Sequence, residues 1–207
     1  AKNIKHGPNL LKEKKKRDMR FLRVAAVGII LVLSSIVMAD NKSTSEYGKD
    51  REHFLNLNRM AKSVRKYFGR NPVVEAAIYG NSGVETGNSF AYDQKQYGGG
   101  GGYGVFQFDF HKPYYREYLE EEGLPDNTDS QVRYVYENIY GKKQNIVGAG
   151  NAKKLRDAFQ SDDPEFVSDK FMEIFLRPGK PHRDRRVDLS KKYHKQLVKA
   201  YGDESGE

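Results

Sequence analysis

The chain has 207 residues, of which 37% are hydrophobic and 31% charged, with 14 Tyr, 11 Phe and no Cys or Trp. This composition predicts one folded domain with appendages, and it excludes a wholly disordered chain, a disulfide scaffold, a thiolate zinc site and a cysteine nucleophile. The formal net charge of +8 lies almost entirely in residues 1–23, so it does not indicate a nucleic-acid-binding face, and we expect no nucleic-acid partner.

Residues 1–23 are basic, and segment 24–39, which follows them, carries no charge. This order predicts a basic inner segment and a single N-terminal transmembrane anchor, with the chain from residue 40 onward in the periplasm or the extracellular space. Two alternatives stay open for segment 24–39. It would also serve as the hydrophobic part of a signal peptide cleaved after Ala39, or as a buried core helix.

Beyond this segment, hydropathy patterning divides the chain into three parts. We predict a polar tether over residues 40–50, a folded domain over residues 51–201 and a frayed tail over residues 202–207. In the domain, apolar residues recur at helical spacing, Gly69 ends the first such run, and Asn71 with Pro72 predicts the start of the next. We expect helices over residues 51–68, 72–85, 112–122, 129–140, 151–160, 164–176 and 188–201.

The second of these helices carries the first catalytic candidate. At 100° per residue, Glu85 falls on the same face as Ile78 and Asn81, so it continues the apolar stripe of the helix. Burial raises the pKa of a carboxylate on such a face, which suits a general acid near neutral pH. The alternative is that Gly80 and Gly83 end the helix early and leave Glu85 as an exposed loop acid.

Residues 86–110 are rich in Gly, Tyr and Phe and predict a loop followed by a strand. At a period of two, one strand face would pack on the core and the other would line a polar cleft. The core face would hold Phe106, Phe108 and Phe110, and the cleft face Tyr103, Val105, Gln107 and Asp109. The glycines would let the backbone approach a ligand closely, although a flexible linker is the alternative. The predicted fold is α+β, mainly helical, with a small Gly-rich β insertion.

Two motifs carry a resemblance to a known family. Ile78-x-Gly80-Asn81-x-x-x-Glu85-Thr86-Gly87, followed by Gly102-Tyr103-Gly104-Val105-Phe106-Gln107-Phe108, closely resembles the phage-tail lysozyme family. The pair is more loosely similar to goose-type lysozymes and soluble lytic transglycosylases. The resemblance covers roughly residues 51–201 and implies a lysozyme-like domain. Phe108 departs from the Trp common in the family, and five consecutive glycines lengthen the loop.

The resemblance implies cleavage of the β-1,4 bond between N-acetylmuramic acid and N-acetylglucosamine in peptidoglycan, with Glu85 protonating the leaving oxygen and no cofactor. If Asp93 or Asp109 holds a water, the enzyme is an inverting muramidase; if neither does, the muramyl 6-hydroxyl closes an anhydro ring, as in lytic transglycosylases. Asp109 is equally well explained as a turn-capping acid. Tyr103 and Gln107, with Gly102 and Gly104, would contact the sugars.

The remaining charged candidates indicate no further site. His6, His53, His111, His182 and His194 lack metal-ligand spacing, so we expect no metal site and surface positions for all five. The run Arg183, Arg185 and Arg186 predicts a solvated helix start, with contact to acidic wall polymer or viral components as the alternative.

Three functions stay open at this point. The leading one is a membrane-anchored peptidoglycan glycosidase for local wall penetration by a phage or a secretion or conjugation apparatus, with virion or envelope-complex proteins as candidate partners. The others are a peptidoglycan endopeptidase on a lysozyme-like fold and a non-catalytic wall-binding assembly component.

Overall fold

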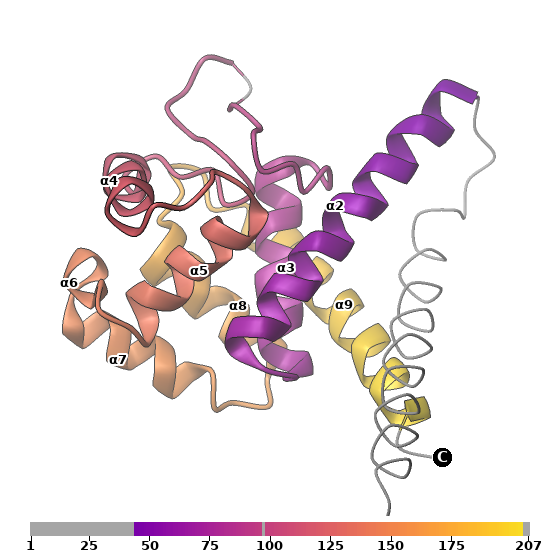
Figure 1. The fold of residues 1–207 in the computed structure, drawn as a ribbon. Helices are drawn as coiled ribbons and strands as arrows, with labels where there is room; N and C mark the ends of the chain where they lie inside the picture. The colour runs from indigo at the N-terminus through magenta and orange to yellow at the C-terminus, as the bar shows by residue number, and fades with distance from the viewer. Residues whose placement is uncertain (1–43, 97, 205–207) are drawn as a thin grey trace, which may run out of the picture.

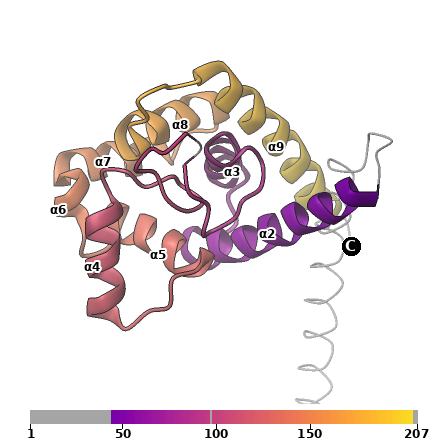
Figure 2. The same cartoon turned by 90° about the horizontal axis from the view of Figure 1, so that it is seen from above.

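A computed structural model describes residues 44–96 and 98–204, which form a mainly helical domain (Figure 1). In chain order the helices are α2 (Thr44–Phe68), α3 (Pro72–Thr86), α4 (Lys112–Glu122), α5 (Thr128–Ile139), α6 (Gln144–Val147), α7 (Ala149–Ala158), α8 (Pro164–Phe171), the π-helix η1 (Met172–Leu176) and α9 (Arg183–Glu204). Helix α3 lies at the centre, with α8 and α9 on one side and α2 on the other (Figure 2).

Local sequence explains where α3 begins and ends. The side chain of Asn71 accepts hydrogen bonds from the backbone N–H groups of Val73 and Val74, and Pro72 occupies the first turn. At the other end, Gly87 adopts a left-handed conformation with φ of 59°. The predicted helix and its cap are therefore confirmed, and Gly80 and Gly83 do not end it early.

The other predicted helices are also present, with small differences at their ends. Helix α2 begins at Thr44, so residues 44–50 of the predicted tether are helical, and α9 extends to Glu204, into the predicted tail. Helix α6 was not predicted. The basic segment 1–23 and the predicted span 24–39 lie outside the described residues. Among the residues that are described, no helix is long and apolar enough to cross a membrane.

The predicted β insertion is wrong. Residues 44–96 and 98–204 contain no strand, and their β-type pairing is limited to a single antiparallel bridge between Lys95 and Tyr103. Tyr103 and Phe108 exchange two backbone hydrogen bonds, of 3.1 and 2.8 Å, and close a tight turn between them. Gly104 and Gln107, inside this turn, have φ values of 80° and 47°. These left-handed conformations break the extended backbone that a period of two requires.

The turn changes which side chains reach the core. Phe106 and Phe108 are buried as predicted, and their rings stack with centroids 5.6 Å apart. Val105, expected in a cleft, is fully buried, whereas Phe110, expected in the core, is 50% exposed. Asp109 and Tyr103 therefore do not share a strand face.

Helices α3 and α9 cross at a very close approach that requires Gly80. A Cβ atom at this position would lie 2.1 Å from Ser190 Oγ, 2.7 Å from Ser190 N and 2.9 Å from Arg186 O. Backbone atoms cannot move aside as a flexible side chain can, so any larger residue pushes the helices apart.

We expect Gly80→Ala to destabilise the domain by about 2 kcal/mol, because the clash outweighs the gain in helix propensity. Chemical denaturation measures the change. Gly150→Ala in α7 is the matched control, since nothing lies within 4 Å of its added Cβ atom and it should be neutral or slightly stabilising. Equal stability of the two variants would contradict the close crossing.

His111 was predicted at the surface and is buried instead, with 3% of its area exposed. Its Nε2 lies 3.1 Å from the carbonyl oxygen of Phe175, and its Nδ1 lies 3.1 Å from the hydroxyl of Tyr134. Since a carbonyl only accepts, Nε2 carries the proton and Nδ1 accepts from Tyr134. Burial lowers the pKa of His111 from 6.5 to about 4, against the opposing effect of the Phe175 hydrogen bond.

This depressed pKa makes stability depend on pH. Between pH 6.5 and about 4 the unfolded chain binds a proton at His111 that the folded chain does not. Stability therefore falls as pH drops through this window, by up to about 3 kcal/mol. In His111→Gln, which is neutral throughout, the free energy of unfolding should vary less over the same window. Parallel pH curves for the two proteins would contradict the assignment.

Candidate active site

Glu85 occupies the last turn of α3, directly before the left-handed Gly87 that ends the helix. Its side chain is 15% exposed, so it is largely buried but still reaches the surface. The predicted position on the apolar stripe is therefore correct. A buried carboxylate needs a partner, and α9 supplies it.

Arg186 of α9 pairs with Glu85 through a hydrogen-bonded ion pair of 2.8 Å between Nη2 and Oε1. The guanidinium is 2% exposed and is held on its other edges. Its Nε donates to the carbonyl oxygen of Pro181 at 2.6 Å, and its Nη1 donates to the backbone and side-chain oxygens of Asn81 at 3.3 and 3.2 Å. These fixed donors leave the arginine one orientation, and Glu85 takes its position from it.

Burial and charge act in opposite directions on Glu85. Burial raises the pKa of its carboxyl above the ordinary value of 4.5, whereas Arg186 and His182 lower it. The burial effect is the larger, so the pKa of Glu85 is raised overall. A carboxyl group with a raised pKa and an open edge can hold a proton and give it up to a ligand.

A second buried carboxylate on α3 does not share these properties. Glu75 is fully buried and is bonded by Arg65 at 2.9 Å, by the hydroxyl of Tyr79 at 2.8 Å and by the hydroxyl of Tyr201. It lies ten residues before Glu85, about 15 Å along the helix. Its contacts join α2, α3 and α9 in a closed polar cluster, so Glu75 is structural.

No ion pair or hydrogen bond joins Glu85 to Asp93 or Asp109, the two predicted second carboxylates, in the described part of the chain. Asp93 and Asp109 are both exposed, and neither is among the groups that shift the pKa of Glu85. Asp109 packs beside the glycine run, since a Cβ atom on Gly101 would lie 2.4 Å from its Oδ1. A direct pairing of either aspartate with Glu85 is not seen. Their catalytic roles stay predictions.

The predicted sugar-binding residues form one folded loop. Gln107 Nε2 donates to the carbonyl oxygens of Gln94 and Gly104, at 3.2 and 2.9 Å. The backbone N–H of Gly102 donates to Oε1 of Gln96 at 2.9 Å, and the hydroxyl of Tyr103 donates to a carboxylate oxygen of Asp126 at 2.6 Å. These bonds order the glycine-rich loop internally. Contact of these residues with sugar stays a prediction.

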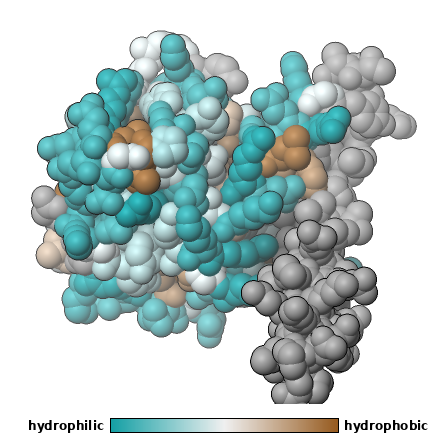
Figure 3. Space-filling model, viewed as in Figure 1, coloured by the Kyte–Doolittle hydropathy of each residue, from teal (hydrophilic) through white to brown (hydrophobic). Residues whose placement is uncertain are grey.

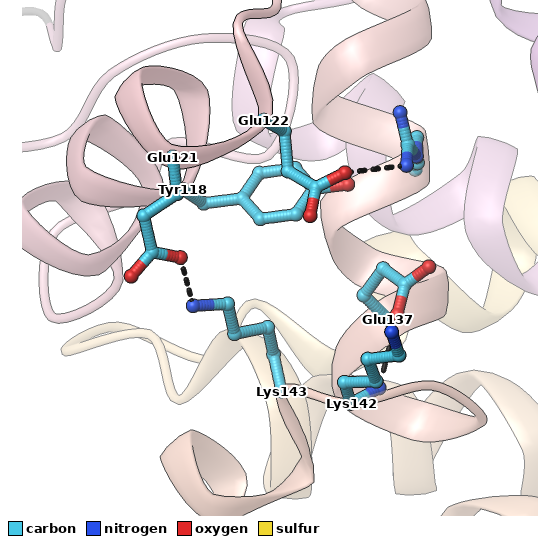
Figure 4. A pocket seen from close by; sticks show the side chains of 7 residues that line it. Tyr118, Glu121, Glu122, Glu137, Lys142 and Lys143 are labelled. Carbon is cyan, nitrogen blue, oxygen red and sulfur yellow. Dashed lines mark hydrogen bonds and ion pairs between the residues drawn. The ribbon is translucent and has the colours of Figure 1, made fainter.

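One cavity of the domain is lined by residues that do not include Glu85. It has a volume of about 490 Å³ and is formed by α4, α5 and the segment after α5 (Figure 4). Its lining residues are Tyr118, Glu121, Glu122, Arg133, Glu137, Lys142 and Lys143. Most of these charges are satisfied within the lining, since Glu122 pairs with Arg133 at 2.8 Å and Glu121 pairs with Lys143. This cavity carries no part of the predicted chemistry.

Arg186 is the site residue that sequence analysis missed. In the sequence it belongs to a basic run at a helix start, and its neighbours Arg183 and Arg185 are indeed exposed. The available signal is the helical period of α9: Arg186 is one turn before Ser190, and Tyr193 and Leu197 continue the buried stripe. An arginine on such a stripe needs a buried acid as a partner.

The described residues contain no group of three or more His, Asp and Glu side chains that could hold a metal ion. His53 and His194 are partly buried and His182 is exposed, so the surface prediction fails for His111 among the described histidines. At Glu85 the structure provides a largely buried carboxyl group with a raised pKa, held by Arg186.

Comparison with known proteins identifies one family. Residues 57–197 match the family model described as phage tail lysozyme, which is more than half of the chain. No curated protein and no solved structure matches the chain. The matched segment includes both α3 with Glu85 and the part of α9 that carries Arg186.

Proposed function

The chain belongs to the phage tail lysozyme family and is a peptidoglycan-degrading enzyme of the glycosidase type, and from this premise we propose that Glu85 is its catalytic acid. The bond to be cleaved is the β-1,4 bond between N-acetylmuramic acid and N-acetylglucosamine. Glu85 gives its proton to the glycosidic oxygen as the C1–O bond breaks, which removes the need to expel an alkoxide.

One observation carries this proposal. Glu85 is a largely buried carboxyl group with a raised pKa, held by a fixed arginine at the end of the central helix. A scaffold protein would gain nothing from burying a charged pair whose carboxylate still reaches the surface, since buried ion pairs contribute little net stability. An acid catalyst needs this arrangement, because it must be mostly protonated near its working pH and still touch its substrate.

For the second step we propose ring closure in place of hydrolysis. An inverting hydrolase needs a second carboxylate that holds water about 6.5–9.5 Å from the acid. Asp93 and Asp109 are both exposed, and the charged groups that act on the pKa of Glu85 are Arg186 and His182. In our proposal the muramyl 6-hydroxyl oxygen bonds to C1, Glu85 takes up the hydroxyl proton, and an anhydro ring forms without consuming water.

We also propose that segment 24–39 anchors the enzyme, with residues 1–23 in the cytoplasm and the domain in the periplasm or the extracellular space. The nine Lys and Arg residues of segment 1–23, set against Glu13 and Asp18, support this orientation. An anchored enzyme would open the wall locally, as a phage or an envelope-spanning apparatus requires. Protease accessibility of the domain in whole cells and in lysed cells tests the orientation.

Mass spectrometry of products from purified peptidoglycan tests the reaction. Our proposal expects 1,6-anhydromuramyl ends that disappear with Glu85→Gln. Reducing muramyl ends would instead establish a muramidase and give Asp93 or Asp109 the role of holding water. Cut peptides on intact glycan would establish an endopeptidase, and folded protein that forms no products would establish a wall-binding component.

A further inference from the structure

Two exposed aromatic side chains lie together beyond the glycine-rich loop. Phe110 and Tyr114 are 50% and 39% exposed, and their ring centroids are 5.5 Å apart. Six large hydrophobic side chains are exposed in the described part of the chain: Leu55, Phe110, Tyr114, Tyr140, Phe166 and Val198. The face seen in Figure 1 is mostly hydrophilic, with small hydrophobic areas, one of them over α2 (Figure 3). Phe110 and Tyr114 are the members of this set whose rings contact each other, and we call them the aromatic platform.

The aromatic platform rests on a rigid base. The ring of Phe110 contacts that of buried His111, with centroids 5.3 Å apart, and His111 in turn stacks on Phe175 at 4.4 Å. Tyr114 follows in the first turn of α4. A ligand that binds these rings therefore need not pay for ordering them.

A cation lies over one ring of the aromatic platform. The guanidinium of Arg177 lies 5.7 Å from the centre of the Phe110 ring, and its Nε donates to the carbonyl oxygen of Ile174 at 2.9 Å. Arg177 has a φ of 48°, a conformation that non-glycine residues rarely adopt, so its backbone is held in place by the surrounding structure. Its Nη2 donates to the carbonyl oxygen of Val147 at 3.4 Å, which leaves Nη1 to offer hydrogen bonds next to the aromatic platform.

A short segment connects the aromatic platform to the acid. From Arg177 the chain reaches Pro181 in four residues, a span of at most about 14 Å. The carbonyl oxygen of Pro181 binds Arg186, which binds Glu85. Two prolines, Pro178 and Pro181, stiffen this segment. The aromatic platform is thus joined to the acid through Arg177, a five-residue segment that also contains Gly179, and Arg186.

We propose that the aromatic platform, with Arg177, is a distal subsite that binds a sugar ring of the glycan strand being cut. This inference rests on the proposed function. A pyranose presents a flat C–H face that packs on an aromatic face, and its rim carries hydroxyl and acetamido oxygens that Arg177 can bind. Two rings are far too small for a stable protein interface, which needs about 800 Å² on each partner. Two rings are enough to bind one further sugar of a linear glycan whose other end is held at Glu85.

Binding of peptide-free glycan strands tests the subsite independently of catalysis. The full chain carrying Glu85→Gln is titrated with strands of six sugars and of two sugars. Combining Phe110→Ala with Tyr114→Ala should weaken binding of the six-sugar strand about tenfold and leave the two-sugar strand unchanged. The matched control is Phe166→Ala, because Phe166 is similarly exposed, at 42%, and has Lys170 5.8 Å from its ring centre.

A second pair of variants, Phe110→Leu and Tyr114→Leu, keeps apolar volume and removes the flat faces, so it should reproduce the loss if the alanine pair fails to fold. The proposal is overturned if the six-sugar strand binds platform variants and the Phe166→Ala control equally, or if it does not bind the Glu85→Gln chain at all. If the variants at Phe110 and Tyr114 lose equal affinity for the six-sugar and the two-sugar strand, the proposal is also overturned. Cleavage that survives Glu85→Gln would refute the proposed function without touching this binding comparison.

Discussion

Glu85→Gln is expected to lower the rate of peptidoglycan cleavage about a thousandfold and to leave the fold intact. General acid catalysis contributes about 10²–10⁴ to a rate, and an amide has no proton to give to the glycosidic oxygen. The amide oxygen still accepts the hydrogen bond from Arg186, so packing at the end of α3 is preserved. Release of soluble glycan from purified peptidoglycan measures the loss, and a melting curve checks the fold.

Glu120→Gln serves as the control, since this glutamate is exposed on α4 and should keep full activity. Asp93→Asn and Asp109→Asn then distinguish ring closure by the muramyl 6-hydroxyl from hydrolysis by a water that a second carboxylate holds. Ring closure predicts activity close to that of the parent in both variants. A large loss in either one would restore the inverting muramidase. Full activity of Glu85→Gln would remove Glu85 from the mechanism.

Arg186→Gln is expected to shift the pH dependence of cleavage and to weaken the fold. Glu85 must carry its proton to act as an acid, so activity falls as pH rises through its pKa. Arg186 lowers that pKa, so removing its charge should move the fall in activity to higher pH, by about one unit. The change also leaves two buried oxygens of Asn81 without their donor, at a stability cost of about 3 kcal/mol.

Arg185→Gln is the matched control, because Arg185 is adjacent and exposed, and it should change neither property. Arg186→Lys keeps the positive charge but lacks the planar donors of the guanidinium. Compared with Arg186→Gln, it should bring the pH profile of cleavage part of the way back to that of the parent and recover a smaller part of the lost stability. If Arg186→Gln loses stability while its pH profile stays unchanged, the arginine is a packing residue and does not tune the acid.

The helices were predictable because their signals are local. Gly69, Asn71 with Pro72, and the apolar spacing around Ile78 act within a few residues of the boundaries they set. The position of Glu85 followed from the same helical period. The predicted strand over residues 103–110 is wrong because period-two spacing assumes an extended backbone. Gln107 adopts a left-handed conformation instead, which is rare for glutamine and could not be predicted from its residue type.

The partner of the acid was not predictable from local pattern. Arg186 sits in a run of exposed basic residues, and its burial depends on Gly80 and Ser190 letting two distant helices approach. The predicted surface position of His111 is wrong for the same reason, because the carbonyl oxygen of Phe175 that accepts its hydrogen bond lies 64 residues further along the chain. Tertiary contacts of this kind override the surface preference of a residue type.

The pairing of Glu85 with Arg186 also sets when the candidate active site can form during synthesis. The two residues are 101 positions apart, so a ribosome working at 5–20 residues per second takes about 5–20 s to make the arginine after the acid. Until then a nascent chain has a glutamate without its partner and a central helix without its α9 covering. The Glu85–Arg186 pair can therefore form only after the chain has been synthesised as far as α9.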